Sequence, residues 1–264
     1  MNKGLMGGNG VGDDPFSVRG KAIFVAGGTR GIGQAVSIHL ARAGASVIAN
    51  YLRNEQSAER LKAIAAEENL QISFCRADLT TDKGLERVSE SLQGSGSILS
   101  GLVYCAATGV HRPIDELTDR HFDFTFGLNV RAFMKLVQLL KPRFIEGSSI
   151  VALSSWGATR AIPHYTLVGA SKGALESLAR HLAAELAPAG VRVNILTAGA
   201  VLTDVWKAIP NSEERLAETI RRTPTGRLVT PEEVACGVRF LCSDAASAVI
   251  GQTLILDGGA GILA

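Results

Sequence analysis

The stretch Ile23-Phe24-Val25-Ala26-Gly27-Gly28-Thr29-Arg30-Gly31-Ile32-Gly33 decides the fold of this chain. A short apolar run leads directly into glycines spaced G-x-x-x-G-x-G, and a helical pattern follows from Gln34 to Ala43. Glycines at a strand-to-helix junction permit a tight turn and let the backbone approach a pyrophosphate, which the helix N-terminus attracts. The stretch therefore predicts a dinucleotide site; a purely structural glycine turn is the alternative.

Apolar runs and helical patterns alternate along the rest of the chain. Near-continuous apolar runs are typical of strands that are covered on both faces, and their alternation with helices indicates one parallel sheet. Further strands are expected at 47–49, 102–104, 150–153, 191–195 and 254–256, and further helices at 55–68, 82–92, 121–142, 165–186 and 231–241. Because no linker or repeat divides the chain, we predict a single α/β domain, a doubly wound parallel sheet, over residues 20–264.

The composition argues against several other classes of protein. A net charge of +2 and an aromatic content of 5% give no bulk attraction to nucleic acid or to anionic membranes. No uncharged apolar stretch is long enough to span a membrane. The four cysteines lack metal-ligand spacing, so no metal is expected and reduced thiols in a cytoplasmic protein are the better interpretation. Residues 1–19 contain five glycines and no apolar core of a signal peptide, and we expect a flexible leader there.

The end of the second predicted strand indicates which dinucleotide would bind. NAD-specific sites usually place an acidic residue there to bond the ribose 2′-hydroxyl. Here the segment Ala49-Asn50-Tyr51-Leu52-Arg53-Asn54 has no acid. Arg30 and Arg53 could instead hold a 2′-phosphate, which predicts NADPH. Two solvated arginines are the alternative.

A tyrosine and a lysine stand seven residues apart, at Tyr165 and Lys172. On one helix this spacing puts both side chains on the same face, with a rise of roughly 10 Å between them. Pro163 suits the first turn of that helix and would place Tyr165 near its start. A packed aromatic and a solvated lysine are the alternative, but the glycine motif at residues 27–33 favours a catalytic pair.

These motifs together resemble the short-chain dehydrogenase/reductase superfamily over about residues 20–262. The resemblance rests on the glycine loop and on Ala77-Asp78-Leu79, Asn129, Ser154-Ser155, Lys172, Val191-Arg192-Val193-Asn194 and Asp257-Gly258-Gly259. Most members carry the tyrosine four residues before the lysine, where Val168 stands here. The Tyr165–Lys172 spacing is similar to that of bacterial enoyl-acyl-carrier-protein reductases, and segments 50–53 and 106–113 are similar to their NADPH-dependent FabL branch.

The resemblance implies a Rossmann-type fold and a role for each matching residue. Tyr165 would bond the thioester oxygen and Lys172 would hold the nicotinamide ribose. Ser155 occupies the position of the superfamily's catalytic serine, with either a catalytic or a supporting role. The implied cofactor site consists of Gly27, Thr29, Arg30, Gly31, Ile32, Arg53, Asp78, Leu79, Ala106, Asn129, Lys172, Ala198 and Thr203. It also implies a mobile substrate loop at 203–227, a thioester of acyl carrier protein or coenzyme A as substrate, and a homotetramer with helices 121–142 and 165–186 at one interface.

Three functions remain open from the sequence. The first is an enoyl-thioester reductase of fatty-acid biosynthesis or a related secondary pathway. The second is a carbonyl reductase that uses Ser155 and Tyr165 on a ketone, against which Val168 argues. The third is an inactive NADP(H)-binding protein, against which the presence of both Tyr165 and Lys172 argues. A departure from the superfamily is Cys105, which replaces an asparagine in the turn after the strand expected at 102–104.

Overall fold

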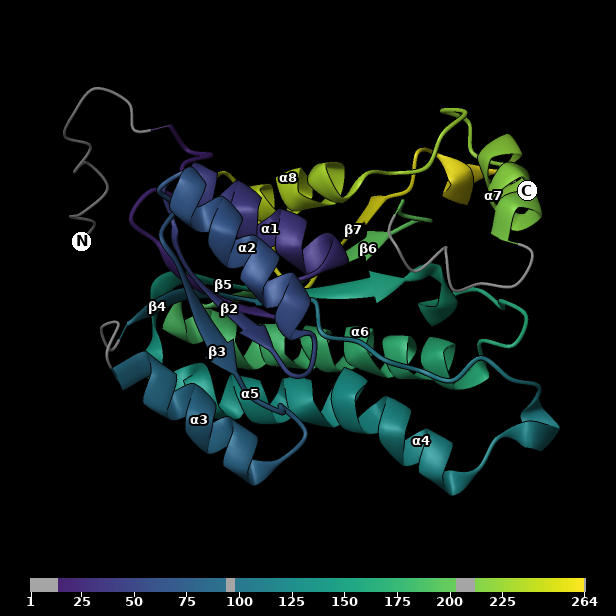
Figure 1. Cartoon of the computed structure of the whole chain (residues 1–264), viewed down its shortest axis with the longest axis horizontal. Helices are drawn as coiled ribbons and strands as arrows, with labels where there is room; N and C mark the ends of the chain where they lie inside the picture. Colours follow the sequence, from purple (N-terminus) through teal and green to yellow (C-terminus); the bar gives the residue numbers. More distant parts are fainter. Residues whose placement is uncertain (1–13, 94–97, 203–211, 264) are drawn as a thin grey trace, which may run out of the picture.

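The computed structural model describes residues 14–93, 98–202 and 212–263. Its centre is a seven-stranded parallel sheet in the order β3-β2-β1-β4-β5-β6-β7 (Figure 1). The strands are β1 Ala22–Ala26, β2 Ser46–Tyr51, β3 Ile72–Arg76, β4 Leu99–Tyr104, β5 Phe144–Ser155, β6 Arg192–Ala198 and β7 Thr253–Leu256. The strand order reverses between β1 and β4, which is where doubly wound sheets bind nucleotides. The predicted fold class is confirmed.

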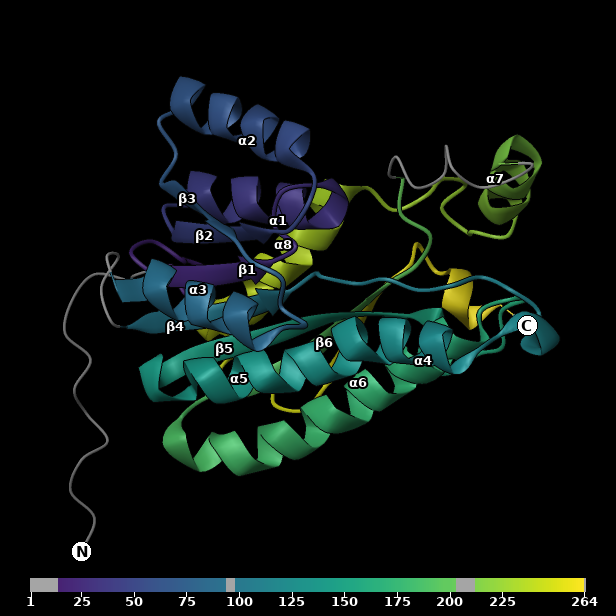
Figure 2. The same cartoon turned by 60° about the horizontal axis from the view of Figure 1, so that its bottom comes forward.

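Helices cover both faces of the sheet (Figure 2). One face carries α1 Gly31–Arg42, α2 Glu55–Glu67 and α8 Pro231–Cys242. The other carries α3 Asp82–Gln93, α4 Asp119–Phe126, α5 Phe133–Leu140 and α6 Thr166–Leu186. Two separate apolar clusters fill these layers, which explains why residues of the central strands, such as all seven of β6, are buried.

Polar side chains fix where several helices begin. Asn54 accepts a hydrogen bond from the Ser57 backbone N–H at the start of α2. Thr230 and Glu233 form a reciprocal capping box at the start of α8, with Pro231 at its first position. Such caps satisfy backbone N–H groups that have no partner inside the helix.

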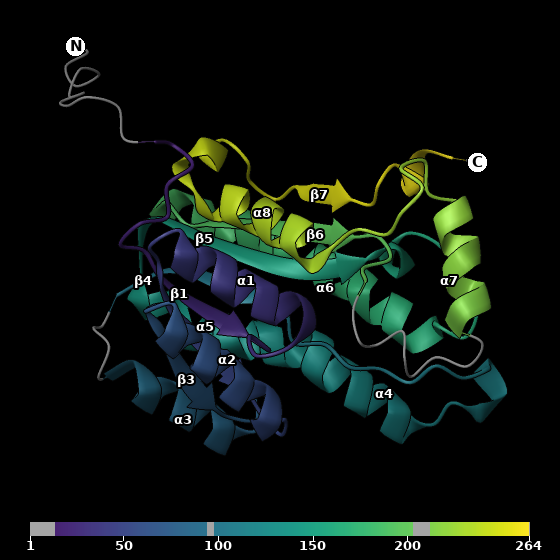
Figure 3. The same ribbon diagram turned by 45° about the horizontal axis from the view of Figure 1, so that its top comes forward.

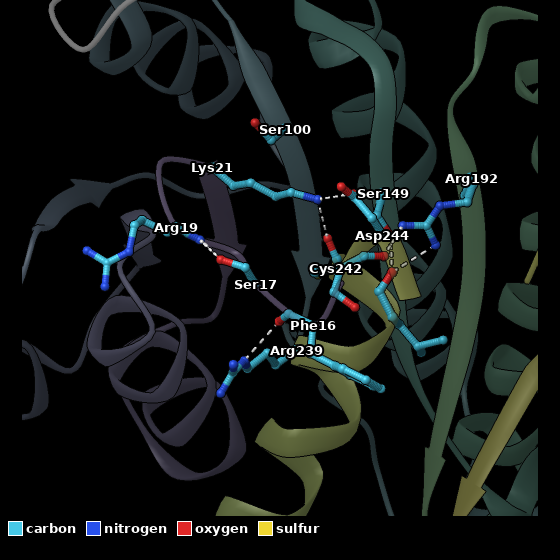
Figure 4. A network of polar contacts seen from close by, with 12 residues as sticks. Phe16, Ser17, Arg19, Lys21, Ser100, Ser149, Arg192, Arg239, Cys242 and Asp244 are labelled. Atoms are coloured by element: carbon cyan, nitrogen blue, oxygen red, sulfur yellow. Dashed lines mark hydrogen bonds and ion pairs between the residues drawn. The ribbon is translucent and has the colours of Figure 1, made fainter. Parts of the chain in front are cut away.

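The C-terminal end of α8 is held by two buried or half-buried cations at the amino ends of the strands (Figure 4). Lys21 Nζ donates to the carbonyl oxygen of Cys242 over 3.0 Å, and the Arg192 guanidinium donates to those of Leu241 and Ser243 over 2.9 and 3.0 Å. The last carbonyls of a helix lack partners within the helix and carry partial negative charge. This contact explains why an arginine that is only 5% exposed can stand at the first position of β6.

The sequence predictions need four corrections. The β3 strand was not anticipated, because Ser73 and Arg76 interrupt its apolar run. The helix expected at 121–142 is two α-helices joined by a π-helical turn over Gly127–Ala132. The expected leader over 1–19 is too long, since residues 14–19 pack on the domain and Val18 is fully buried; residues 1–13 lie outside the described residues.

The fourth correction concerns the segment after β6. It was expected to be a loop over 203–227, yet it contains a helix, α7 Ser212–Arg221. Residues 203–211 lie outside the described residues. Figure 3 shows α7 beyond the carboxyl ends of the strands, on the same side as the C-terminus. The helix therefore stands next to the edge of the sheet where the site residues gather.

Candidate functional site

The glycine loop connects β1 to α1 in a conformation that only glycine allows. Gly27 and Gly31 have φ angles of +71° and +52°. A Cβ on Gly33 would lie 2.0 Å from the Gly27 carbonyl oxygen, and one on Gly27 would lie 3.0 Å from the Ala106 backbone. The Arg30 side chain forms no capping hydrogen bond at the start of α1, so the first N–H groups of this helix suit a pyrophosphate. The loop therefore fits a dinucleotide, and Ala106 lies directly beside it.

Asn50, near the end of β2, fastens this loop to the sheet. Its buried side chain donates to the carbonyls of Cys75 and Ala77 over 3.2 and 3.1 Å and accepts from the Gly27 N–H over 3.4 Å. The sequence analysis assigned this role to no residue, although an amide at the end of a buried strand was a signal. Asn50 therefore shapes the site from beneath.

The two arginines predicted to recognise a 2′-phosphate lie at the same edge of the sheet. Arg30 immediately precedes α1 and Arg53 follows β2, and both are exposed. Within the described ranges, neither guanidinium pairs with a carboxylate. Thr29, between the glycines, is buried. Both cations are thus available to an anionic ligand.

Asp78 and Leu79 follow β3 along the same edge. The Asp78 carboxylate accepts hydrogen bonds from the Thr80 N–H and hydroxyl, and Leu79 is buried. A Cβ on Gly84 would lie 1.8 Å from the Asp78 carbonyl oxygen, so α3 packs tightly under this turn. The turn is therefore held rigidly where an adenine contact was predicted.

Asn129 lies in the π-helical turn and is fully buried. Its amide oxygen accepts from the Thr108 N–H over 2.9 Å, and its nitrogen donates to the Thr108 carbonyl over 2.8 Å and to the Ser171 hydroxyl over 2.9 Å. Both amide hydrogens are used within the protein. Asn129 thus links the loop after β4 to α6, and its direct contact with a cofactor stays a prediction.

Tyr165 and Ser155 come together at the carboxyl end of β5. Ser155 is the last residue of β5, and Tyr165 is the residue that immediately precedes α6. Their hydroxyl oxygens are 3.4 Å apart. The sequence had suggested that Pro163 lies in the first turn of the helix. In the structure it lies in a turn before α6, because the chain reverses at His164, which has a φ of +58°. The turn brings the phenol over the end of the sheet.

Lys172 lies two turns along α6 and is buried. Its Nζ donates to the Leu153 carbonyl oxygen over 2.7 Å. Burial lowers the pKa of Lys172 to about 8, although the nearby Cys105 and Glu176 oppose the shift. Burial raises the pKa of the Cys105 thiol to about 12, so this residue presents a neutral thiol near the lysine. Lys172 lies within α6 and Tyr165 lies directly before this helix, and their joint catalytic role stays a prediction.

The buried carboxylate of Glu176 was missed by the sequence analysis. It accepts hydrogen bonds from the Ser154 hydroxyl over 2.6 Å and the Thr197 hydroxyl over 3.3 Å. Its position four residues after Lys172, one turn along the same helix, was the available signal. Glu176 ties α6 to β5 and β6 and places a negative charge near the lysine.

The remaining predicted residues lie after β6. Ala198 ends that strand and is buried, while Thr203 lies outside the described residues. Most described residues of the predicted site therefore lie at or just after the carboxyl ends of β1 to β6, whereas Lys172 lies within α6 and Asn129 lies in the π-helical turn.

Two other kinds of site are absent from the described part of the chain. Within 14–93, 98–202 and 212–263, no three His, Cys, Asp or Glu side chains are placed to hold a metal ion together. Among the helices of the same residues, none combines the length and apolarity that a membrane crossing needs.

Comparisons with known proteins agree with this geometry. A family model described as enoyl-(acyl carrier protein) reductase matches residues 26–261. A 1-cyclohexenylcarbonyl-CoA reductase from Streptomyces collinus is 33% identical and aligns over 93% of this chain and 89% of its own. An L-xylulose reductase from Caenorhabditis elegans is also 33% identical, over 90% and 95%.

Solved structures show the same architecture. A putative NAD(P)-dependent gluconate 5-dehydrogenase from Beutenbergia cavernae, with bound NADP, is 32% identical with a TM-score of 0.87, over 95% of this chain and 100% of that one. A dehydrogenase/reductase from Sinorhizobium meliloti is 30% identical with a TM-score of 0.86, over 93% and 97%. The chain therefore belongs to the short-chain dehydrogenase/reductase superfamily, within the family described as enoyl-(acyl carrier protein) reductase.

Proposed function

We propose that this oxidoreductase is an NADPH-dependent enoyl-thioester reductase, which reduces the trans-2 double bond of an acyl chain in fatty-acid biosynthesis or a related pathway. The observation that carries the proposal is the placement of Tyr165 beside Ser155, with Lys172 two turns along α6 and a valine at position 168. The family description and the reductase of an unsaturated acyl-CoA from Streptomyces collinus support it.

The cofactor is NADP(H). The glycine loop leaves room for a pyrophosphate, Arg30 and Arg53 are available for a 2′-phosphate, and the related dehydrogenase from Beutenbergia cavernae binds NADP. When bound, reduced nicotinamide supplies a hydride to the β-carbon of the substrate. All four cysteines are free thiols, which agrees with the cytoplasmic location that we also propose.

Tyr165, Ser155 and Lys172 would stabilise the negative charge that develops on the substrate. As the β-carbon gains a hydride, negative charge accumulates on the thioester oxygen, and the Tyr165 hydroxyl donates a hydrogen bond to it. The Ser155 hydroxyl lies 3.4 Å from the phenol oxygen, close enough to contact the same substrate oxygen. The Lys172 ammonium adds positive potential from a buried position, where charge is poorly screened.

Val168 separates this proposal from ordinary ketone reduction. The valine is 5% exposed, and one of its methyl groups lies where a Cβ on Gly109 would be, only 2.1 Å away. Most members of the superfamily carry the tyrosine four residues before the lysine. Here that position is taken by Val168, which packs between α6 and the loop after β4. A phenol at that position would have no room without movement of the loop.

A carbonyl reductase is the second candidate. The contact between the Ser155 and Tyr165 hydroxyls favours it, because two donors beside one carbonyl oxygen also suit a ketone. The L-xylulose reductase relative supports this possibility. Purified protein assayed for NADPH oxidation with crotonyl and acetoacetyl thioesters side by side tests the two candidates. Faster reduction of the acetoacetyl thioester would refute the enoyl assignment.

An acyl carrier protein is one candidate donor, and α7 is the surface that we propose for it. Arg221 and Arg222 are highly exposed there, and both pair with Glu218 of the same helix. Arg227 is less suited, since it forms a two-bond ion pair with Glu233 of α8. Charge reversal at Arg221 and Arg222 should raise KM for carrier-bound substrate and spare the coenzyme A thioester. An equal effect on both substrates would indicate a solvated helix instead.

We also propose a homotetramer in which α4, α5 and α6 form one interface. Phe122 and Phe124 of α4 are about half exposed, and Met134 of α5 is also exposed. Exposed apolar side chains on neighbouring helices are typical of association surfaces. Light scattering at micromolar concentration should show four subunits, and a monomer would refute the proposal.

A further inference from the structure

The position of the Tyr165 ring cannot be fixed by its hydroxyl alone. The phenol oxygen contacts the Ser155 hydroxyl over 3.4 Å, which is longer than the 2.7–2.8 Å typical of a good O–H···O bond. Tyr165 also lies just outside the first turn of α6, so no turn of the helix lies on its N-terminal side to pack it. Ring packing must therefore decide where the hydroxyl points.

One side of the ring rests on glycine backbone. A Cβ on Gly157 would lie 2.5 and 2.6 Å from Cε1 and Cδ1 of Tyr165. A Cβ on Gly169, one turn into α6, would lie 2.7 Å from the Gly157 carbonyl oxygen and 3.6 Å from Tyr165 Cδ1. Two glycines thus let the segment after β5 and the helix approach closely, and the phenol lies directly on that segment.

His111 contacts the ring from the loop after β4. The two ring centroids are 5.1 Å apart with planes at 68°, an edge-to-face arrangement that aromatic pairs prefer. Partial burial lowers the pKa of His111, which favours the neutral form of its imidazole. The contact therefore acts through ring packing without bringing a positive charge to the phenol.

The loop that carries His111 is itself held in place. The Asn129 side chain accepts a hydrogen bond from the Thr108 backbone N–H and donates one to the Thr108 carbonyl oxygen. Gly109 accommodates a methyl group of Val168 from α6. These contacts come just before His111 in the chain and fix the path of the loop relative to α6. The imidazole is thus presented to Tyr165 by a rigid support, although the ring itself is exposed.

We propose that His111 is a positioning residue, whose ring holds Tyr165 against Gly157 so that the phenol hydroxyl points at the substrate carbonyl. The proposal rests on the proposed enoyl-thioester reduction. It assigns a reason to the histidine in an exposed loop, where a solvated side chain would otherwise be expected. It also predicts that position 111 requires an aromatic ring for packing against Tyr165 and does not require a titratable nitrogen.

The kinetic test compares His111→Ala with His111→Phe in the full chain. We expect the alanine variant to lose about tenfold in kcat for crotonyl thioester, the upper range for one aromatic pair, with NADPH affinity unchanged. The phenylalanine variant should stay within about twofold of wild type. His39→Ala, in the last turn of α1, is the matched control and should have no effect on kcat. Equal losses in both His111 variants would overturn the proposal.

A spectroscopic test does not depend on the reaction. The chain has three tyrosines, so protein labelled with 3-fluorotyrosine should give three fluorine NMR signals, and Tyr165→Phe assigns one of them. His111→Ala should shift or broaden that signal and leave those of Tyr51 and Tyr104 unchanged, whereas His111→Phe should keep it narrow. An unchanged Tyr165 signal in His111→Ala would overturn the positioning role. Wild-type protein that reduces no enoyl thioester would instead overturn the proposed function, and this measurement would still decide the role of His111.

Discussion

Replacing Tyr165 by phenylalanine removes one oxygen atom from the centre of the proposed site. Among the described residues, that oxygen contacts one side-chain hydroxyl, that of Ser155, over 3.4 Å. A weak hydrogen bond that is partly open to water contributes under about 1 kcal/mol to folding. The ring contacts with Gly157 and His111 remain in the variant. The change should therefore leave stability almost unaltered.

The effect on catalysis should be much larger. Loss of one donor to a developing oxyanion typically costs 100-fold or more in kcat, which corresponds to about 2.7 kcal/mol of transition-state stabilisation. No other described hydroxyl lies beside that of Tyr165 except Ser155, at the end of β5. We therefore expect Tyr165→Phe to reduce crotonyl thioester at about 1% of the wild-type rate or less.

The assay separates catalysis from binding and folding. Steady-state NADPH oxidation gives kcat, fluorescence titration gives Kd for NADPH, and thermal unfolding gives Tm. Tyr165→Phe should change kcat alone, whereas Lys172→Ala should also weaken NADPH binding, because the amine is buried beneath the predicted ribose position. Full crotonyl activity in Tyr165→Phe would refute the mechanism. A drop in Tm with no preferential loss of kcat would show that the tyrosine is only structural.

The remaining predictions concern the cofactor, the lysine, the packing of α6 and the end of α8. Wild-type protein should bind NADPH at least about tenfold more tightly than NADH, and Arg53→Ala should weaken NADPH far more than NADH; equal dissociation constants would contradict the 2′-phosphate contact. The pKa of Lys172 is lowered to about 8, so the amine is charged below that pH and neutral above it. NADPH titrations from pH 7 to about 9.5 should therefore show weaker binding as the pH rises through about 8. Lys172→Met should lack this step. Val168→Tyr restores the four-residue spacing but meets Gly109, so it should lower Tm and give no useful reduction of acetoacetyl thioester. Arg192→Met should lower the free energy of unfolding in urea by about 3 kcal/mol, because carbonyls at the end of α8 lose a buried cationic donor; a loss under about 0.5 kcal/mol would show that water replaces it.

The sequence by itself determined the architecture and the conformation of the glycine loop. Buried parallel strands must be apolar on both faces, so five of the six later strands are recognisable as local runs. The glycines of the first loop are also recognisable in the sequence. Gly27 has a positive φ angle, and a Cβ on Gly33 would clash with the backbone of Gly27. The spacing of Tyr165 and Lys172 was local as well, since one helix and the residue before it carry both.

Other features depended on contacts between distant segments. The β3 strand lies at the edge of the sheet, where polar side chains are tolerated, so its sequence lacks the apolar signal. The π-helical turn around Asn129 satisfies hydrogen bonds to Thr108 and Ser171, which are far away in the chain.

The surroundings of the tyrosine also became visible only in three dimensions. His111 and Tyr165 are separated by more than fifty residues, and no helical or strand period relates them. The Gly157 backbone and the loop held by Asn129 bring their rings together. Local periodicity determines which elements form, because each element buries its own apolar face. The packing of those elements alone decides which side chain from one loop meets which side chain at the start of another helix.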